Sequence, residues 1–276
     1  MQMSDTSTIT VSRAILSARR RKWTAPDFVL RLLSPLAILL LWEIASRAGL
    51  IPTRVIAAPS EISTTLWELI RSGELLRHLL VSLQRAVTGL SIGVAIGVSA
   101  ALITGLSKRG EIALDSPMQM LRTIPSLALV PLFILWFGIG EFTKVALIVM
   151  GTTFPIYLNL FAGIRNIDPK LVEAANTLGL NRRELIWHVI LPGALPSFFV
   201  GLRYSLGISW LALVFVEQIN TTAGIGFLAS DARDFMRTDV IVICLLIYSL
   251  LGLLIDGLIR TLERLALAWR PSFIRT

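Results

Sequence analysis

Cysteine and charged side chains are scarce in this 276-residue sequence. The single cysteine, Cys244, excludes an internal disulfide framework and a zinc site built from several thiolates. Charged residues make up only 16%, against about 25% in soluble globular domains, whereas hydrophobic residues make up 54%. This composition excludes a disordered chain and an ordinary cytosolic enzyme, and it points to a membrane protein.

Long apolar runs predict an all-α membrane protein with about six transmembrane helices. A helix needs about 20 apolar residues to cross the hydrocarbon core of a bilayer, because each residue adds about 1.5 Å. The predicted spans are residues 28–44, 79–106, 116–137, 142–164, 196–216 and 240–259. The first span also resembles a signal peptide, but five more spans follow it and Arg47 disturbs the candidate cleavage site.

The net charge of +8 is explained by where the cations lie. Sixteen Lys and Arg residues fall in the tails and connections of one side of the membrane, and seven fall on the other. Because Lys and Arg are enriched in cytoplasmic loops, both termini are predicted to be cytoplasmic. Residues 1–27 then form a basic cytoplasmic tail and residues 28–276 the transmembrane domain. Without an aromatic and basic stripe, nucleic acid is not an expected partner.

Two connections on the outer side are long enough to have structure. Residues 59–77 have the apolar spacing of a short helix that Ser60 can cap, and we expect it to lie on the bilayer. The other connection contains Gly224-Ile225-Gly226, which resembles a dinucleotide fingerprint. No strand precedes it, so a nucleotide site is not expected and a flexible hairpin is predicted instead.

The cytoplasmic connection at about residues 168–190 predicts a pair of short helices. Asp168 can cap the first helix and Gly179 can end it. Asn181 and Glu184 have the spacing of a capping box for the second helix, and Pro192 is expected to end it before the next span. Leu171, Val172, Ala175 and Leu178 form one apolar stripe on the first helix, which needs a partner.

The motif Glu173-Ala174-Ala175, followed by Gly179 and then Val189-Ile190-Leu191-Pro192, resembles the EAA signature of permease subunits of bacterial ABC importers. Further stretches, among them Leu135-Trp136-Phe137-Gly138-Ile139 and Phe154-Pro155-Ile156-Tyr157, are similar to the aliphatic sulfonate branch, whose relatives carry taurine, nitrate or bicarbonate. The resemblance extends over roughly residues 72–269. It implies the type I ABC importer permease fold in the bacterial inner membrane.

The resemblance also implies partners and site residues. A second permease copy, two cytoplasmic ATPase subunits and a periplasmic substrate-binding protein would complete the importer, with ATP and Mg on the ATPase chains. This chain has no Gly-rich phosphate loop and no His-Glu-x-x-His motif, so neither catalysis nor a metal site is expected in it. The implied ATPase-coupling residues are Glu173, Ala174, Ala175, Leu178, Gly179 and Leu180.

Three arginines fall within or near the ends of predicted spans, where an unpaired cation is costly. Arg85, Arg122 and Arg203 are therefore candidates to line a pathway for an anion. The alternative is that they pair with Glu217, Asp256 or backbone carbonyls. Arg122 lies just before Pro125, which is expected to disturb its helix and is also a pathway candidate.

Small residues recur every four positions in the second predicted span, at Gly89, Gly93, Gly97, Ala101 and Gly105. This spacing predicts a close helix-helix contact, and packing within the same chain is favoured over packing with a second copy.

Two other classes of membrane protein are alternatives to an importer permease. A secondary transporter would need inverted repeats and midplane carboxylates, and an intramembrane enzyme would need a nucleophile with a base; neither pattern is found.

Overall fold

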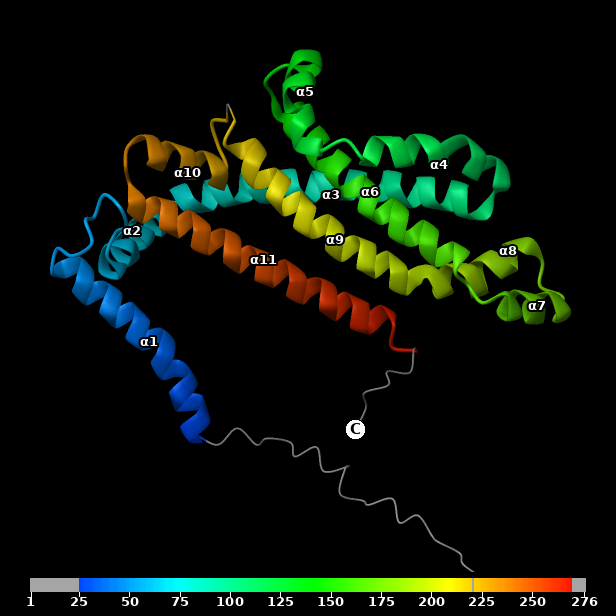
Figure 1. Cartoon of the computed structure of the whole chain (residues 1–276), viewed down its shortest axis with the longest axis horizontal. Helices are drawn as coiled ribbons and strands as arrows, with labels where there is room; N and C mark the ends of the chain where they lie inside the picture. The colour runs from blue at the N-terminus through cyan, green and yellow to red at the C-terminus, as the bar shows by residue number, and fades with distance from the viewer. Residues whose placement is uncertain (1–24, 220, 270–276) are drawn as a thin grey trace, which may run out of the picture. The chain divides into compact units, whose positions relative to one another are not determined.

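The computed structural model describes residues 25–219 and 221–269, in which every regular element is helical (Figure 1). The chain divides into two compact units, Met1–Ile51 and Pro52–Thr276. The first contains α1 (Ala25–Arg47). The second contains α2 (Pro59–Arg71), α3 (Glu74–Leu106), α4 (Lys108–Arg122), α5 (Val130–Phe137), α6 (Glu141–Arg165), α7 (Pro169–Thr177), α8 (Arg182–Leu185), α9 (Leu191–Glu217), α10 (Ile225–Asp234) and α11 (Thr238–Ala266). The all-α prediction is confirmed, while the basic tail before residue 25 lies outside the described residues.

Four helical segments of the described residues are long and apolar enough to cross a membrane. They are α3, α6, the continuous segment Arg182–Glu217, and α11, of 33, 25, 36 and 29 residues. Four of the six predicted spans fall within them, and the first predicted span, residues 28–44, lies within α1.

The third predicted span, residues 116–137, is not one helix, and this prediction is corrected. Helix α4 ends at Arg122, a 3-10 turn follows at Ser126–Leu129, and α5 has only eight residues. Pro125 explains the break, since proline lacks an N–H donor and disfavours helical geometry in the residue before it. The chain therefore changes direction where an uninterrupted span was expected.

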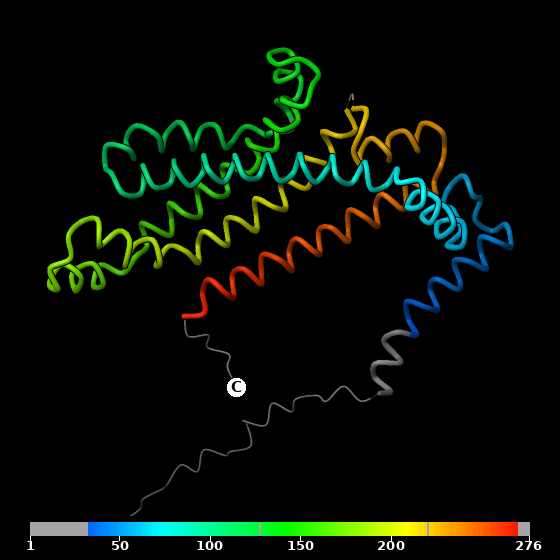
Figure 2. The backbone as a smooth tube through the Cα atoms, turned by 180° about the vertical axis from the view of Figure 1, so that it is seen from behind, coloured from blue at the N-terminus to red at the C-terminus, as the bar shows by residue number. Residues whose placement is uncertain are grey.

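Helix α6 is the central helix of the second unit and packs extensively on both α3 and α9. The small-residue stripe of α3 makes the first of these contacts: a Cβ on Gly89 would lie 2.5 Å from Ile148 Cγ2, and one on Gly97 would lie 2.7 Å from the Thr153 carbonyl oxygen. The prediction of close packing within the chain is confirmed. Helix α4 lies alongside α3 in the opposite direction (Figure 2).

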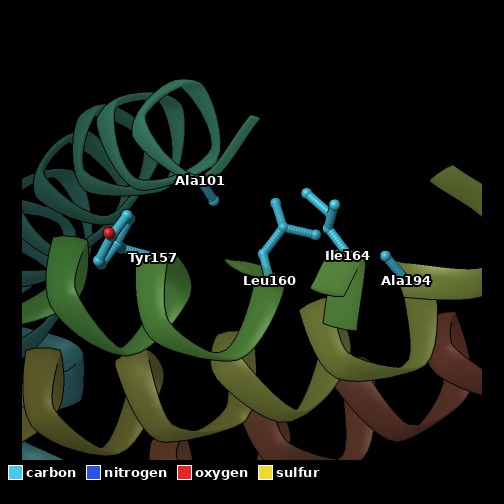
Figure 3. Packing of buried hydrophobic residues seen from close by; sticks show 5 residues of the cluster. All are labelled: Ala101, Tyr157, Leu160, Ile164 and Ala194. Carbon is cyan, nitrogen blue, oxygen red and sulfur yellow. The ribbon is translucent and has the colours of Figure 1, made fainter. Parts of the chain in front are cut away.

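A core cluster joins these helices near one end of α6 (Figure 3). Tyr157, Leu160 and Ile164 of α6 pack with Ala101 of α3 and Ala194 of α9. The Tyr157 hydroxyl donates to Asp115 Oδ1 of α4 at 2.8 Å, so its polar atom is satisfied although the ring is fully buried. The cluster fixes the ends of α6 and α9 from which α7 and α8 extend.

The two ends of the second unit differ in their elements. At one end α7 and α8 connect α6 to α9, and at the other end α2 and α10 contact α3 and α11 (Figure 1). Helix α2 begins after Ala58, so Ser60 is not its N-cap as predicted. The predicted flexible hairpin after α9 is also wrong in part, because residues 225–234 form the helix α10.

Candidate functional site

The α7–α8 pair is built by local capping, as its sequence predicts. The Asp168 carboxylate accepts a hydrogen bond from the Lys170 backbone N–H at 2.9 Å. Asn181 Oδ1 accepts from the N–H groups of Arg183 and Glu184, each at 3.0 Å, and the Glu184 carboxylate accepts from the Asn181 N–H at 2.8 Å. These bonds satisfy helix N-terminal donors that would otherwise need water.

Gly179 ends α7 in the left-handed conformation, with φ of +78°. The Leu180 N–H then reaches back to the Ala175 carbonyl oxygen at 3.1 Å, which closes the end of the helix. Glycine has no Cβ to oppose this geometry, so the turn from α7 to α8 is set by one residue.

The second short helix does not end where predicted. Helix α8, a π-helical turn at Ile186–Ile190 and α9 form one continuous 36-residue segment. Pro192 closely follows the π-helical turn, and such a local adjustment lets a helix accommodate a proline without ending. Helix α8 is therefore joined to α9 by helical residues rather than by a loop.

The apolar stripe of α7 is divided between two environments. Ala175 is buried, and Val172 lines a groove of about 440 Å³ with Leu106, Ile164 and Ile186. Leu171 and Leu178, of the same stripe, are 56% and 80% exposed. The implied coupling residues Glu173, Ala174 and Gly179 are also exposed, and Leu180 is half-buried. This short helix thus presents two leucines that no described part of the chain covers.

A second hollow lies where α4 ends. Arg122 and Pro125 line an open groove of about 370 Å³ together with Pro155 of α6 and Tyr204 of α9. Arg122 is exposed and has no ion-pair partner among the residues that the structure describes. Pro155 has no backbone N–H, so the α6 carbonyl oxygen one turn before it does not accept the usual helical hydrogen bond. The groove therefore combines a free cation with polar groups between apolar walls.

The other two candidate arginines are paired. Arg85 is buried and contacts Glu217 at 2.9 Å and Glu141 at 2.6 Å. Arg203 pairs with Glu263 and lies 3.9 Å from Asp256. The structure thus brings Arg122 and Pro125 together and places Arg85 and Arg203 elsewhere, with the carboxylate partners that the alternative interpretation requires.

The cluster around Arg85 is not predicted by the sequence. The sequence indicates Glu217 only as one of several partners, and it does not indicate Glu141, Ser82 or His78 as neighbours of Arg85. A signal existed in the spacing of His78, Ser82 and Arg85, which places three polar side chains on one face of an otherwise apolar helix.

This arrangement of helices, with a capped helix pair between two long apolar helices, is found in known structures. Two solved structures share the fold: an amino acid ABC transporter, with a TM-score of 0.61, 22% identity and coverage of 72% of this chain and 97% of that one, and the MetNI methionine ABC transporter, with a TM-score of 0.55, 16% identity and coverage of 72% and 97%.

Sequence similarity to known proteins shows the family to which the chain belongs. The chain matches the binding-protein-dependent transport system inner membrane component over residues 93–266, and it belongs to that family. It is 48% identical to the aliphatic sulfonates transport permease protein SsuC of Escherichia coli (strain K12) over 92% of this chain and 95% of that one. It is 43% identical to SsuC of Bacillus subtilis (strain 168) over 88% of each, and 33% identical to the taurine transport permease TauC of Escherichia coli (strain K12) over 92% and 95%. The chain is an ABC importer permease subunit of the inner membrane.

Proposed function

We propose that this chain forms the translocation pathway for aliphatic sulfonates. The observation that carries the proposal is the identity of 48% and 43% to two permeases named for these substrates, over most of each chain. The groove at Arg122 supports it, because an exposed guanidinium that has no carboxylate partner among the described residues attracts anions. Arg122 and Pro125 are the pathway residues of this proposal. Arg85 and Arg203, which already have carboxylate partners, act in helix packing.

The α7–α8 pair would couple this pathway to ATP. Leu171 and Leu178 supply an exposed apolar surface for the ATPase subunit, and Glu173, Ala174, Ala175, Gly179 and Leu180 shape the turn that presents it. Since α8 continues into α9, a push on this pair is transmitted along a helix rather than absorbed by a loop.

The working importer would contain two copies of this chain, two ATPase subunits and an external binding protein. Both termini, including the basic tail of residues 1–27, would be cytoplasmic, on the side of α7 and α8. ATP binding would draw the two coupling pairs together and open the pathway outward, and hydrolysis would reset it. This is alternating access driven from a partner chain.

Uptake of a labelled alkanesulfonate tests the substrate. Cells with and without this chain would be compared, each shown to contain the ATPase and the binding protein. Excess unlabelled taurine, nitrate or bicarbonate would be added as competitors. We expect uptake that requires the chain and resists all three competitors.

The second candidate substrate is taurine, favoured by the 33% identity to a taurine permease over 92% of this chain. Chain-dependent uptake of labelled taurine without uptake of longer alkanesulfonates would replace the first proposal. Nitrate and bicarbonate, the other substrates of this branch, are tested by the same assay.

A further inference from the structure

Glu217, the last residue of α9, is fully buried at the end of the unit opposite α7 and α8. Its carboxylate accepts hydrogen bonds from the Ser82 hydroxyl, whose Oγ lies 2.7 and 2.8 Å from the two carboxylate oxygens, from Arg85 Nη1 at 2.9 Å and from the Gly226 backbone N–H at 2.9 Å. Tyr248 of α11 adds a longer contact at 3.4 Å. Donors from α3, α10 and α11 thus surround one anion, which makes its burial tolerable.

Two glycines lie where the Glu217 side chain comes close to the backbone. A Cβ on Gly224 would lie 2.5 Å from Glu217 Oε1, and Gly224 also has φ of +122°, which side chains rarely adopt. A Cβ on Gly226 would lie 2.5 Å from the Glu217 Cβ. The Gly224-Ile225-Gly226 stretch therefore does hold an anion at a helix N-terminus, as such motifs do, but the anion belongs to the chain itself.

One face of α3 holds the rest of the turn before α10. His78 Nδ1 accepts from the Gly224 N–H at 3.0 Å, Ser82 Oγ accepts from the Ile225 N–H at 2.8 Å, and Arg85 Nη1 donates to the Ala223 carbonyl oxygen at 2.6 Å. His78, Ser82 and Arg85 are spaced four and three residues apart, so they lie on one side of the helix. The turn is therefore fixed by side chains rather than by its own backbone.

The other side of the Arg85 guanidinium binds a second carboxylate, that of Glu141. Arg85 Nε and Nη2 donate to the two carboxylate oxygens of Glu141 at 2.6 Å each, and Lys144 Nζ reaches the same carboxylate at 2.9 Å. The Glu141 side chain is 62% exposed, whereas that of Glu217 is 0% exposed. Water can replace the partners of Glu141 but not those of Glu217.

We propose that Glu217 is a positioning residue: it seats α10 on α3 through Ser82, Arg85 and Gly226. The exposed Glu141, bound to the other side of the Arg85 guanidinium, holds the start of α6 and is not needed to hold α10. On the proposed orientation, which rests on the proposed function, this gives the external binding protein a fixed surface at the outer end.

Hydrogen exchange of the reconstituted transporter tests the proposal without any transport assay. Glu217→Gln is expected to speed exchange of the amides of residues 221–230 by at least about tenfold, because the charge that holds them is lost. Glu141→Gln is expected to change the same amides by less than about twofold while speeding exchange at the start of α6. Asp234→Asn is the matched control, since it removes an exposed carboxylate from α10 itself.

The proposal would be overturned if the amides of residues 221–230 exchange as slowly in Glu217→Gln as in the wild type. It would also be overturned if Glu141→Gln speeds their exchange as much as Glu217→Gln does. If Glu217→Gln does not reach the membrane, Ser82→Ala and Gly226→Ala are measured instead; unchanged exchange in both overturns it as well.

A second readout separates positioning from mere stability. In Gly226→Ala, the concentration of binding protein that gives half-maximal ATPase stimulation is expected to rise at least about tenfold. An unchanged concentration would show that α10 does not present the receptor surface. If the wild-type transporter does not take up sulfonates, the proposed substrate is wrong, but the hydrogen-exchange result is unaffected.

Discussion

The α7–α8 end and the Glu217 end of the molecule are built in opposite ways. The first uses local bonds between residues two to five apart, and its leucines remain exposed. The second joins residues 132 to 146 positions apart through buried charges and hydroxyls. This difference suits the proposed roles: the α7–α8 end would dock an ATPase subunit through its exposed leucines, and the Glu217 end would hold α10 in place through its buried bonds.

The largest effect is expected from breaking the buried end. Arg85→Met leaves the Glu217 carboxylate in place without its cation, which should lower the free energy of unfolding by about 3–5 kcal/mol. Thermal unfolding of the purified permease would measure it. Arg182→Met is the matched change at the other end, where the side chain is exposed and donates one bond to the Leu106 carbonyl oxygen. Equal losses in both variants would contradict the contrast between the two ends.

The next effect concerns the turn of the exposed end. Gly179→Val places a β-branched side chain at φ of +78°, a conformation that costs about 1–2 kcal/mol outside glycine. We expect the ATPase recovered with the purified permease to fall about tenfold, since 1.4 kcal/mol corresponds to that factor. Gly257→Val is the control, because Gly257 has open space around it and no positive φ. Full recovery of ATPase with Gly179→Val would argue against this turn as the coupling element.

Arg122→Ala tests the groove rather than either end. It should lower sulfonate uptake about tenfold, because the free cation that attracts the anion is removed, and it should leave the ATPase bound. Labelled uptake and copurification are measured together. Arg260→Ala, which removes an exposed cation paired with Asp256, serves as control. Unchanged uptake would remove Arg122 from the pathway.

The smallest effect is expected from a single cap. Asn181→Ala removes the acceptor of two backbone N–H groups and should cost about 1 kcal/mol. Thr177→Ala, which loses only an exposed bond to the Glu173 carbonyl oxygen, is its control. A shift in unfolding temperature for Asn181→Ala no larger than that of Thr177→Ala would show that the cap does not stabilise α8.

These two ends also differ in what their sequence predicts. The caps at Asp168, Gly179 and Asn181 were predicted because each bond joins near neighbours in the chain. The partners of Glu217 were not, since nothing local in α3 says which of its polar residues will face the end of α9. Even the glycine motif at residues 224–226 was interpreted as a flexible turn, because its anion lies outside the motif.

The membrane spans also show what a local sequence pattern can and cannot predict. Apolar length predicted α3, α6, α9 and α11, but it could not distinguish one span from two short helices at residues 116–137. Pro125 was recognised as a disturbance, yet a proline inside a membrane helix often only bends it. Pro192 is the opposite case, because the helical segment continues through it after a π-helical turn.

The central claim is that α7 and α8 carry the ATP signal into α9. It is tested most directly by the distance between spin labels at position 178 of the two copies that the proposed transporter contains, after Cys244→Ser removes the only native thiol of this chain. Addition of ATP with hydrolysis blocked is predicted to shorten this distance. A distance that does not change while uptake remains ATP-dependent would contradict the account.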